Sequence, residues 1–268
     1  MGLKANWLTE IKNIFEEQGI YAESAVYHSF KLLLLNEGKV ILHLVSLNQH
    51  DDPKELLSYQ LTCFKEGKQV IHLWEDIWQN RKQQVLSRLK SVLGLNQRLH
   101  GRSTSVVKIS KEDAESFLEA YHIQGSAGGR YRYALLYKDE VIAVAVFSHK
   151  RKMKDKGKDY TSAELVRFAT KDGITVIGGM TKLIKHYLRL FSPNDLMSYA
   201  DRDWSVGNAY QTAGFELVGE TPPCPLYVDP ASYIRYFSHR IPGESDQKKI
   251  NSYIQVFNTG NLKYVLYQ

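Results

Sequence analysis

The sequence predicts an α/β protein of the α+β kind, in which short strands alternate with amphipathic helices. Residues 162–218 read as strand, glycine turn, helix, strand and short helix in succession. Two apolar runs within residues 31–47 flank the turn Asn36-Glu37-Gly38, which is typical of a hairpin. Residues 7–17 place their apolar side chains on one helical stripe. Helices and strands are therefore expected along the whole chain.

Composition describes an ordinary globular protein. Of 268 residues, 43% are hydrophobic and 24% charged, and the net charge of +6 permits a polyanionic partner. Cys63 and Cys224 form neither a disulfide framework nor a C-x-x-C site, so we expect no metal and a reducing location. The most apolar run, Leu32–Leu35, is too short to cross a bilayer, and residues 1–15 lack a signal-peptide core. A cytoplasmic protein without membrane contact is predicted, and the sequence sets no oligomeric state.

The first hundred residues carry a recognisable order of elements. Helical patterns at 53–65 and 79–93 enclose a strand at 69–74, after the first helix and the hairpin. This helix–strand–strand–helix–strand–helix order resembles that of restriction-endonuclease-like cores. The run 70–78, VIHLWEDIW, is similar to the end of Vsr-like and homing-endonuclease-like domains of phages. The resemblance implies such a domain over residues 1–100.

One departure from that pattern bears on activity. Nucleases of this kind hold a divalent metal with clustered carboxylates, but the second hairpin strand, VILHLVSLN at 40–48, has no acidic residue. Glu23, Glu75 and Asp76 remain, and the last two fit a solvated cap between strand and helix equally well. We therefore expect a catalytically degenerate domain that binds or positions DNA.

The middle of the chain, residues 101–230, begins with a helix that Ser110 caps. Strands are predicted at 131–136 and 141–147, and a basic segment follows them. Its cations are Lys150, Arg151, Lys152, Lys154, Lys156 and Lys158. The segment reads either as a solvated loop or as a nucleic-acid contact that releases counterions from phosphates.

Next comes a glycine turn before an amphipathic helix. Such a turn can bind an anion, because backbone N–H groups at a helix start lack partners, although two glycines also fit a plain tight turn. The later Asn208, Tyr210 and Gly214-Phe215 resemble the signature that closes the fold of the GNAT superfamily of N-acetyltransferases, here with compressed spacing. That resemblance implies a mixed, splayed sheet and acyl-CoA as cofactor. The implied cofactor-binding residues are Ile177, Gly178, Gly179, Met180, Thr181 and Asn208.

A further resemblance concerns residues 102–228. His122 with Gly125, Arg167 in the LVRF run and Asp201 in the YAD run follow the motif order of the Mom family of phage DNA-modification proteins. These proteins have the GNAT fold and modify adenine in DNA. The resemblance implies a catalytic set of His122, Arg167, Asp201 and Tyr210.

Three members of the catalytic set also fit a structural role. His122 fits a hydrogen bonder after a helix, Arg167 a salt bridge, and Asp201 a helix cap. In the catalytic interpretation Asp201 is the general base for the adenine amine, while Tyr210 or His122 donates a proton to the leaving group. Arg167 would hold an anionic or carbonyl oxygen, and the base would have to be flipped out of the duplex.

The last segment, residues 231–268, interleaves aromatic and basic residues over Ser232–Arg240. Such interleaving suits base stacking, although aromatic strands are more often core. A final hairpin is expected at 257–264, and the run from Asn258 to Lys263 is similar to the N-x-G-N-x-K tail of homing-endonuclease-like proteins. Four functions remain open: a Mom-like DNA-modifying transferase, an inactive DNA-binding accessory protein, a homing-type endonuclease, and an acetyltransferase acting on a protein or small molecule.

Overall fold

The computed structural model describes residues 6–49, 51–242 and 252–268. Within this part the chain forms two compact units, and each unit is assembled from separate stretches of sequence. Unit 1 takes residues up to 82 with 201–206 and 220–261, and unit 2 takes 83–200, 207–219 and 262–268. The structure thus interleaves stretches where the sequence patterns indicate three consecutive segments, 1–100, 101–230 and 231–268.

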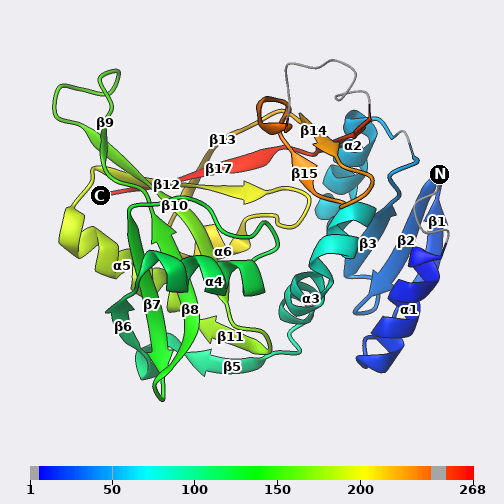
Figure 1. Cartoon of the computed structure of the whole chain (residues 1–268), viewed down its shortest axis with the longest axis horizontal. Helices are drawn as coiled ribbons and strands as arrows, with labels where there is room; N and C mark the ends of the chain where they lie inside the picture. Colours follow the sequence, from blue (N-terminus) through cyan, green and yellow to red (C-terminus); the bar gives the residue numbers. More distant parts are fainter. Residues whose placement is uncertain (1–5, 50, 243–251) are drawn as a thin grey trace. The chain divides into compact units, whose positions relative to one another are not determined.

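Unit 1 contains two sheets (Figure 1). Its elements are α1 (Trp7–Glu17), β1 (Glu23–Tyr27), β2 (Phe30–Leu35), β3 (Val40–Val45), α2 (Pro53–Lys65), β4 (Gln69–Trp74), β14 (Cys224–Val228), β15 (Arg235–Tyr236), η2 (Ser238–Arg240) and β16 (Ile254–Asn258). The larger sheet has the order β1-β2-β3-β4, with β3 and β4 parallel and the other pairs antiparallel. The predicted hairpin, the helix at 53–65 and the strand at 69–74 are confirmed.

The core of unit 1 combines the beginning and the end of the chain. Phe30, Ile41 and Trp74 from the larger sheet cluster with Leu226 and Val256 from the smaller one. The smaller sheet has the order β15-β14-β16. The apolar residues after 220 are therefore needed to bury one side of the first sheet, since an uncovered apolar sheet face is unstable in water.

Helix α3 (Glu75–Val92) begins four residues earlier than predicted and crosses from unit 1 into unit 2. Its backbone leaves the helical region at Arg81 (φ −132°, ψ 32°), next to the boundary between residues 82 and 83. The prediction that Glu75 and Asp76 form a solvated cap is wrong, because both side chains are buried.

Unit 2 is built around an eight-stranded sheet. The elements after α3 are β5 (Gln97–His100), η1 (Gly101–Ser103), β6 (Ser105–Lys108), α4 (Lys111–Tyr121), β7 (Tyr131–Tyr137), β8 (Glu140–Phe147), β9 (Arg151–Lys152), β10 (Thr161–Thr170), β11 (Ile174–Ile177), α5 (Gly179–Phe191), β12 (Asp195–Asp201), α6 (Asn208–Thr212), β13 (Glu216–Glu220) and β17 (Asn261–Tyr267). The sheet order is β13-β17-β12-β10-β8-β7-β6, with the short β9 paired to β10 outside this path. Ser110 caps α4 as predicted, accepting a hydrogen bond from the Asp113 amide at 3.0 Å.

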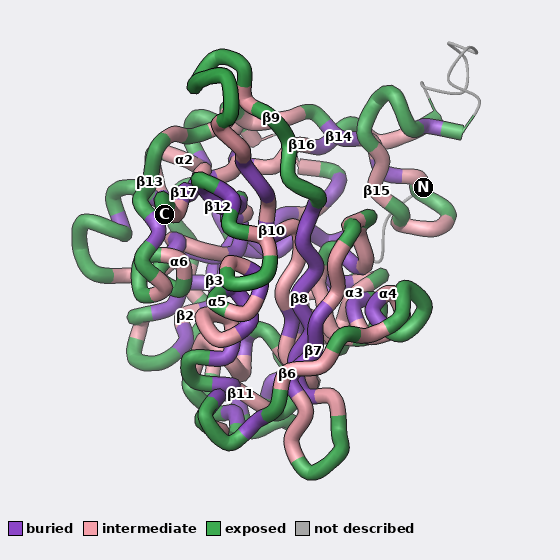
Figure 2. The backbone as a smooth tube through the Cα atoms, turned by 90° about the vertical axis from the view of Figure 1, so that its left-hand side faces the viewer, coloured by how far each residue is buried: buried purple, intermediate pink, exposed green. Residues whose placement is uncertain are grey.

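Both faces of this sheet are covered. Ala143, Ala145 and Phe147 of β8 belong to the same apolar cluster as Leu183 and Tyr187 of α5. The alternate residues Val144 and Val146 cluster with Ala114 and Leu118 of α4. Figure 2 shows β8 as a buried stretch of the tube. The mixed α/β architecture predicted from the sequence is confirmed.

The predicted final hairpin is wrong. β16 pairs with β14 in unit 1, whereas β17 lies between β13 and β12 in the large sheet. The turn between β16 and β17 therefore joins two different sheets. A left-handed turn with glycine and asparagine between strand-forming runs is a local signal, and it does not specify which strands pair.

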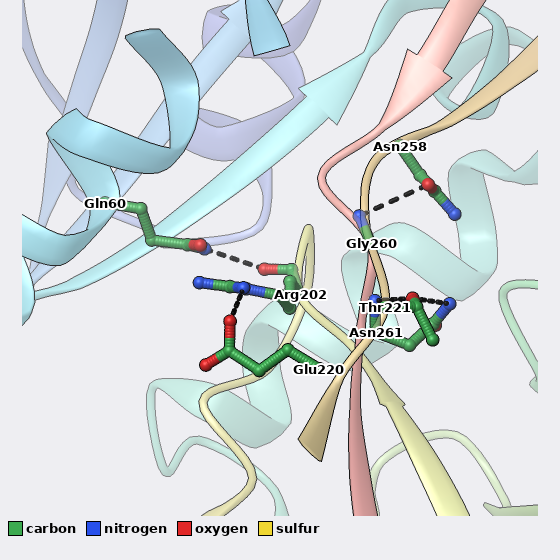
Figure 3. Close-up of polar contacts among 7 residues, drawn as sticks. All are labelled: Gln60, Arg202, Glu220, Thr221, Asn258, Gly260 and Asn261. Carbon is green, nitrogen blue, oxygen red and sulfur yellow. Dashed lines mark hydrogen bonds and ion pairs between the residues drawn. The ribbon is translucent and has the colours of Figure 1, made fainter. Parts of the chain in front are cut away.

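The turn residues are held by one local hydrogen bond and by bonds to residues about 35–40 positions earlier (Figure 3). Asn258 Oδ1 accepts from the Gly260 amide at 3.2 Å and from the Cys224 amide at 3.0 Å. The Asn261 amide donates to Thr221 Oγ1 at 2.8 Å. Gly260 has φ +89°, and an added Cβ would lie 2.2 Å from the Thr221 carbonyl oxygen. The turn sequence is thus fixed by contacts with residues 221–224.

Residues 201–206 are held inside unit 1 in the same way. Gln60 Nε2 donates to the Arg202 carbonyl at 2.7 Å, and Arg202 forms an ion pair with Glu220 at 2.5 Å (Figure 3). Asp203 Oδ1 accepts from both the amide and the hydroxyl of Thr259, at 3.0 and 2.6 Å.

None of the helices in the described part of the chain is long and apolar enough to cross a membrane.

Candidate functional site

The large sheet opens between two parallel strands. β10 and β12 pair only at Ser162↔Asp195, Ala163↔Leu196 and Glu164↔Met197. Both strands continue beyond these pairs, to Thr170 and Asp201. β10 also shifts register against β8 between Leu165 and Arg167, which marks a β-bulge at the same level. Bulges bend a strand and leave a residue unpaired, so this bulge helps β10 to turn away from β12.

Ser198 bridges the strands where their backbone pairing ends. Its buried hydroxyl donates to the Leu165 carbonyl of β10 at 2.9 Å. The same oxygen lies 3.1 Å from the phenol oxygen of Tyr210 on α6. The Tyr210 phenol also lies 3.4 Å from the Tyr199 carbonyl. A serine hydroxyl and a tyrosine hydroxyl therefore stand at the opening of the sheet.

Tyr210 is held rigidly in this position. Its ring stacks on Tyr264 of β17, with ring centres 5.1 Å apart and planes at 15°. The helix that carries Tyr210 begins after Gly207, which has φ +84°. A Cβ at Gly207 would lie 1.9 Å from the Tyr264 hydroxyl, so only glycine permits this approach of α6 to β17.

The electrostatic surroundings keep the Tyr210 phenol protonated. Burial is the main cause that raises its pKa, and the nearby Glu164 raises it further. The hydrogen bond with Ser198 and the charges of Arg88 and Arg167 act in the opposite direction without cancelling the shift. A protonated phenol at a strand opening is able to donate a proton to a leaving group.

Arg167 joins the motif around His122 to this region. Its guanidinium donates to the Gly125 carbonyl at 3.4 Å and to the Val166 carbonyl at 3.0 Å. Residues 122–125 form a turn after α4, in which His122 Nδ1 accepts from the Gln124 amide at 3.1 Å. Three predicted parts, the turn of His122, Arg167 and Tyr210, are thus connected within unit 2.

Asp201, the fourth member of the predicted set, belongs to unit 1. It ends β12, and its Oδ1 accepts from the Asp203 amide at 3.0 Å. Its negative charge acts on Arg235 and raises the pKa of the buried Asp203, for which burial is the larger cause. The Asp201 carboxylate is therefore engaged with unit 1, and its role as a general base stays a prediction.

The glycine turn forms the start of α5. Gly178 has φ +71°. The first backbone hydrogen bond of α5 runs from Lys182 N to Gly178 O at 2.9 Å, so the N–H groups before Lys182 lie ahead of the helical hydrogen bonds. An added Cβ at Gly178 meets nothing within 4 Å, whereas one at Gly179 would lie 2.8 Å from Val176. The amine of Lys182 donates to the Gly101 carbonyl at 2.9 Å. Backbone donors next to open space can bind an anionic group.

The other predicted cofactor residues surround this helix start or begin α6. Ile177 and Gly178 are exposed, Gly179 is buried, and Met180 and Thr181 are half-buried in the first turn of α5. Asn208 is exposed at the first position of α6. The set falls on two helix starts, of which only α5 is long enough to carry a substantial dipole.

All six cations of the basic segment are exposed, and the segment contains the short β9. Among the described residues, two of its six predicted cations have partners of opposite charge. Lys156 Nζ lies 2.8 Å from the buried Asp195, and Lys152 lies 3.9 Å from Asp159. Lys156 therefore serves to fix the segment to β12, while exposed lysine and arginine side chains remain available for a phosphate backbone.

Unit 1 arranges its acidic residues differently from a metal site. Asp76 binds Arg235 through two hydrogen bonds of 2.7 Å, and Glu75 Oε2 accepts from the Leu47 amide at 3.1 Å. The central strand β3 is buried throughout and carries His43, whose Nδ1 lies 3.0 Å from that of His72. Among the described residues no group of three or more His, Cys, Asp or Glu is placed to hold a metal ion.

Three contributors to the site carry no sequence signal. Ser198 is a small polar residue in an apolar strand, Arg88 lies on a helix with several cations, and Glu164 reads as an ordinary strand residue. Their roles depend on strands and helices far apart in the sequence. The register of β10 and β12 is the information that would have identified Ser198.

Comparison with known proteins gives structural matches without sequence matches. No protein-family model matches the chain, and no curated protein matches it. A GNAT family acetyltransferase from Elizabethkingia anophelis with acetyl-CoA bound has 13% identity and a TM-score of 0.38, covering 62% of this chain and 99% of its own.

Two further solved structures give the same result. An IAA acetyltransferase from Bacillus cereus has 17% identity and a TM-score of 0.37, covering 62% of this chain and 100% of its own. Arabidopsis thaliana Naa50, in complex with a bisubstrate analogue, has 11% identity and a TM-score of 0.40, covering 62% and 99%. These TM-scores are below 0.5, so the chemistry of the site is inferred from its geometry.

Proposed function

We propose that this protein is a GNAT-like group transferase that acts on an exocyclic amine of adenine in DNA. The observation that carries the proposal is the opening between β10 and β12, with the Tyr210 hydroxyl held at the point where the strands part. The motif order from His122 to Phe215, which resembles that of Mom-like proteins, supports DNA adenine as the acceptor.

The residues at the start of α5 fit the implied acyl-CoA cofactor. The N–H groups of Gly179, Met180 and Thr181 would hold its pyrophosphate, since they precede the first bond of the helix ladder and the space at Gly178 is open. When bound, this cofactor supplies an activated acyl group. A Cβ at Gly179 would press on Val176, so the tight turn depends on glycine at this position.

The side chains at the opening then have distinct tasks. Tyr210 donates a proton to the leaving group, because its raised pKa keeps the phenol protonated near neutral pH. Ser198 orients Tyr210 and holds the opening through the Leu165 carbonyl. Arg167 provides a fixed positive charge beside the turn that contains His122. Asp201 remains the predicted base that accepts a proton from the amine.

DNA binding would be shared by two regions. The exposed cations between residues 150 and 158 would contact phosphates. The first hundred residues, which resemble a nuclease domain in sequence, would position the duplex without cutting it, because β3 lacks the acidic residue that a metal would need. A base inside a duplex is out of reach for transfer, so the adenine would have to be flipped or unpaired, at a cost of a few kcal/mol.

The test is mass spectrometry of nucleosides from plasmid DNA that was co-expressed with the protein. The expected result is a modified adenosine that depends on Tyr210 and Asp201. Asp201→Asn should lower the yield by about 10²–10⁴, and Tyr210→Phe by less, because water can donate a proton in its place. Tyr137→Phe removes the hydroxyl of the last residue of β7, a strand that β8 separates from β10, and serves as the matched control.

The alternative functions give different results in the same experiment. Unmodified DNA combined with tight DNA binding would indicate an inactive accessory protein. Nicked plasmid would indicate an endonuclease. Transfer to a protein or small molecule, with DNA unchanged, would overturn the choice of acceptor while leaving the transferase assignment intact.

A further inference from the structure

Unit 1 contains a cavity of about 550 Å³ that no part of the proposed transfer site uses. Its walls come from the segment after β3, the end of β4, and the β14–β16 pair. The lining residues are Gln49, Asp51, Pro53, Trp74, Pro223, Pro225, Ile254, Gln255, Val256 and Phe257. A volume of this size falls in the range of small-molecule sites, which run from about 300 to 1,000 Å³.

The apolar walls are made of flat rings. Trp74 and Phe257 pack edge to face, with ring centres 5.0 Å apart. The rings of Pro53, Pro223 and Pro225 complete these walls. A planar ligand can pack against such rings edge to face as well as offset-stacked.

The polar groups of the cavity are few, and two of them lack a partner among the described residues. Gln49 donates to Asp51 Oδ1 at 2.8 Å, but the buried Asp51 Oδ2 accepts from no described residue. The buried indole N–H of Trp74 likewise has no acceptor there. Burial raises the pKa of Asp51, with the charge of Glu55 adding to it and the Gln49 bond opposing it. Among the described residues, the carboxylate therefore has one oxygen without a hydrogen-bond donor.

One acceptor and one donor among flat apolar walls define a ligand class. Adenine and cytosine each present an amino donor next to a ring-nitrogen acceptor on the edge used for base pairing. Thymine and uracil present the carbonyl oxygen O4 where cytosine has the amino group. The amide groups of Gln49 and Gln255 add adaptable contacts. Buried polar groups left unpaired by the wrong ligand discriminate strongly between such analogues.

We propose that this cavity binds an unpaired amino-bearing nucleobase, adenine or cytosine, with Asp51 Oδ2 accepting from the exocyclic amine and Trp74 and Phe257 forming the aromatic wall. The site lies in unit 1, and the proposal does not rest on the transferase activity. The same chemistry is offered by a free nucleotide and by an unpaired base in single-stranded DNA, so the experiment has to separate these sources.

Fluorescence offers a direct assay, because all four tryptophans, Trp7, Trp74, Trp78 and Trp204, belong to unit 1. The probes are AMP, CMP, TMP and N6,N6-dimethyl-AMP, which has no amino hydrogen. Two oligothymidines, with and without one central adenine, test the base within a strand. AMP and CMP should quench the fluorescence and bind roughly tenfold or more tightly than TMP or the dimethylated nucleotide, the difference that one charge-assisted hydrogen bond gives.

Three variants isolate the contacts. Asp51→Ala should abolish the preference for amino-bearing bases. Trp74→Leu should lower the affinity for all the nucleotides, measured by calorimetry. Glu55→Gln removes a nearby negative charge without touching the cavity wall and should preserve the preference.

Equal binding of AMP, dimethyl-AMP and TMP would overturn the proposal, as would an unchanged preference in Asp51→Ala. Binding of AMP without binding of the adenine-containing oligonucleotide would assign the site to a free nucleotide. Tighter binding of the adenine-containing oligonucleotide than of AMP would assign it to DNA. If the transfer assay fails, each of these binding results can still be interpreted, because none of them requires catalysis.

Discussion

The ion pair between Asp76 and Arg235 is expected to hold unit 1 together. Asp76 is fully buried at the start of α3, and Arg235 binds both of its oxygens at 2.7 Å from the last third of the chain. The guanidinium also lies over the ring of Trp74 at 5.4 Å. Arg235→Met keeps most of the side-chain length but leaves the carboxylate buried without its charge partner. Removing one partner of a buried pair costs about 3–5 kcal/mol.

The measurement is urea unfolding followed by tryptophan fluorescence, which reports on unit 1 alone because its four tryptophans are the only ones in the chain. Arg235→Met should lower the free energy of unfolding by about 3–5 kcal/mol, and Arg240→Met, a change in the neighbouring η2, by less than about 1 kcal/mol. Adding Asp76→Asn to Arg235→Met should restore more than half of the loss, since the unpaired charge is removed. A loss below about 1 kcal/mol for Arg235→Met, or no recovery in the double variant, would refute the reasoning.

Three other results are expected. Gly260→Ala should destabilise unit 1 by more than about 2 kcal/mol, because a Cβ would lie 2.2 Å from the Thr221 carbonyl at φ +89°; Gly67→Ala, also in unit 1 and at φ +73° but with nothing within 4 Å of the Cβ, is the control in the same urea assay and should cost less. Burial raises the pKa of Asp203 from 3.8 to about 7, so wild-type stability should fall as pH rises from about 4 to 7; Asp203→Asn should flatten this slope, by up to about 4 kcal/mol in total, and parallel curves would contradict it. Neutralising Lys150, Arg151, Lys152 and Lys154 together should reduce the slope of log K for duplex DNA against log salt by about 3–4, and an unchanged slope would show that the segment is only solvated.

The parts of the fold that sequence patterns predicted depend on local signals. The turn Asn36-Glu37-Gly38 specifies a hairpin because its three residues all adopt positive φ angles, which Asn and Gly tolerate. Ser110 starts α4 through a hydrogen bond to a residue three positions away. Gly178 and Gly179 start α5 because Gly178 has φ +71°, which favours glycine, and a Cβ at Gly179 would lie 2.8 Å from Val176. Each of these features is complete within a few neighbouring residues.

The parts that were missed depend on distant pairing. β11 pairs with β5, more than 70 residues earlier, and neither strand has a strong pattern of its own. Ser198 has a role only because β12 lies beside β10, where its hydroxyl reaches the Leu165 carbonyl. Arg235 reads as a basic residue among aromatics on a surface, yet it neutralises the buried Asp76. Charge patterns indicate what is available for pairing, and only the fold shows which charges are already paired.

The run Asn258–Asn261 shows how one motif can carry two interpretations. As a local pattern it predicts a hairpin, but its two middle residues only connect the end of β16 to the start of β17. Three of its residues nevertheless have a distant partner: the Asn258 side chain binds the Cys224 amide, the Thr259 hydroxyl binds Asp203, and the Asn261 backbone amide binds Thr221 Oγ1. The chain leaves the large sheet after β13 and returns to it after residue 260 as β17, which lies between β13 and β12. Such a detour needs fixed exit and entry points, since an unfixed loop of this length would add closure entropy without defining the register of β17. Hydrogen bonds from Thr221 to Asn261 join the two points directly. The turn residues are therefore required by the passage between sheets, which explains why glycine and asparagine stand there although no hairpin forms.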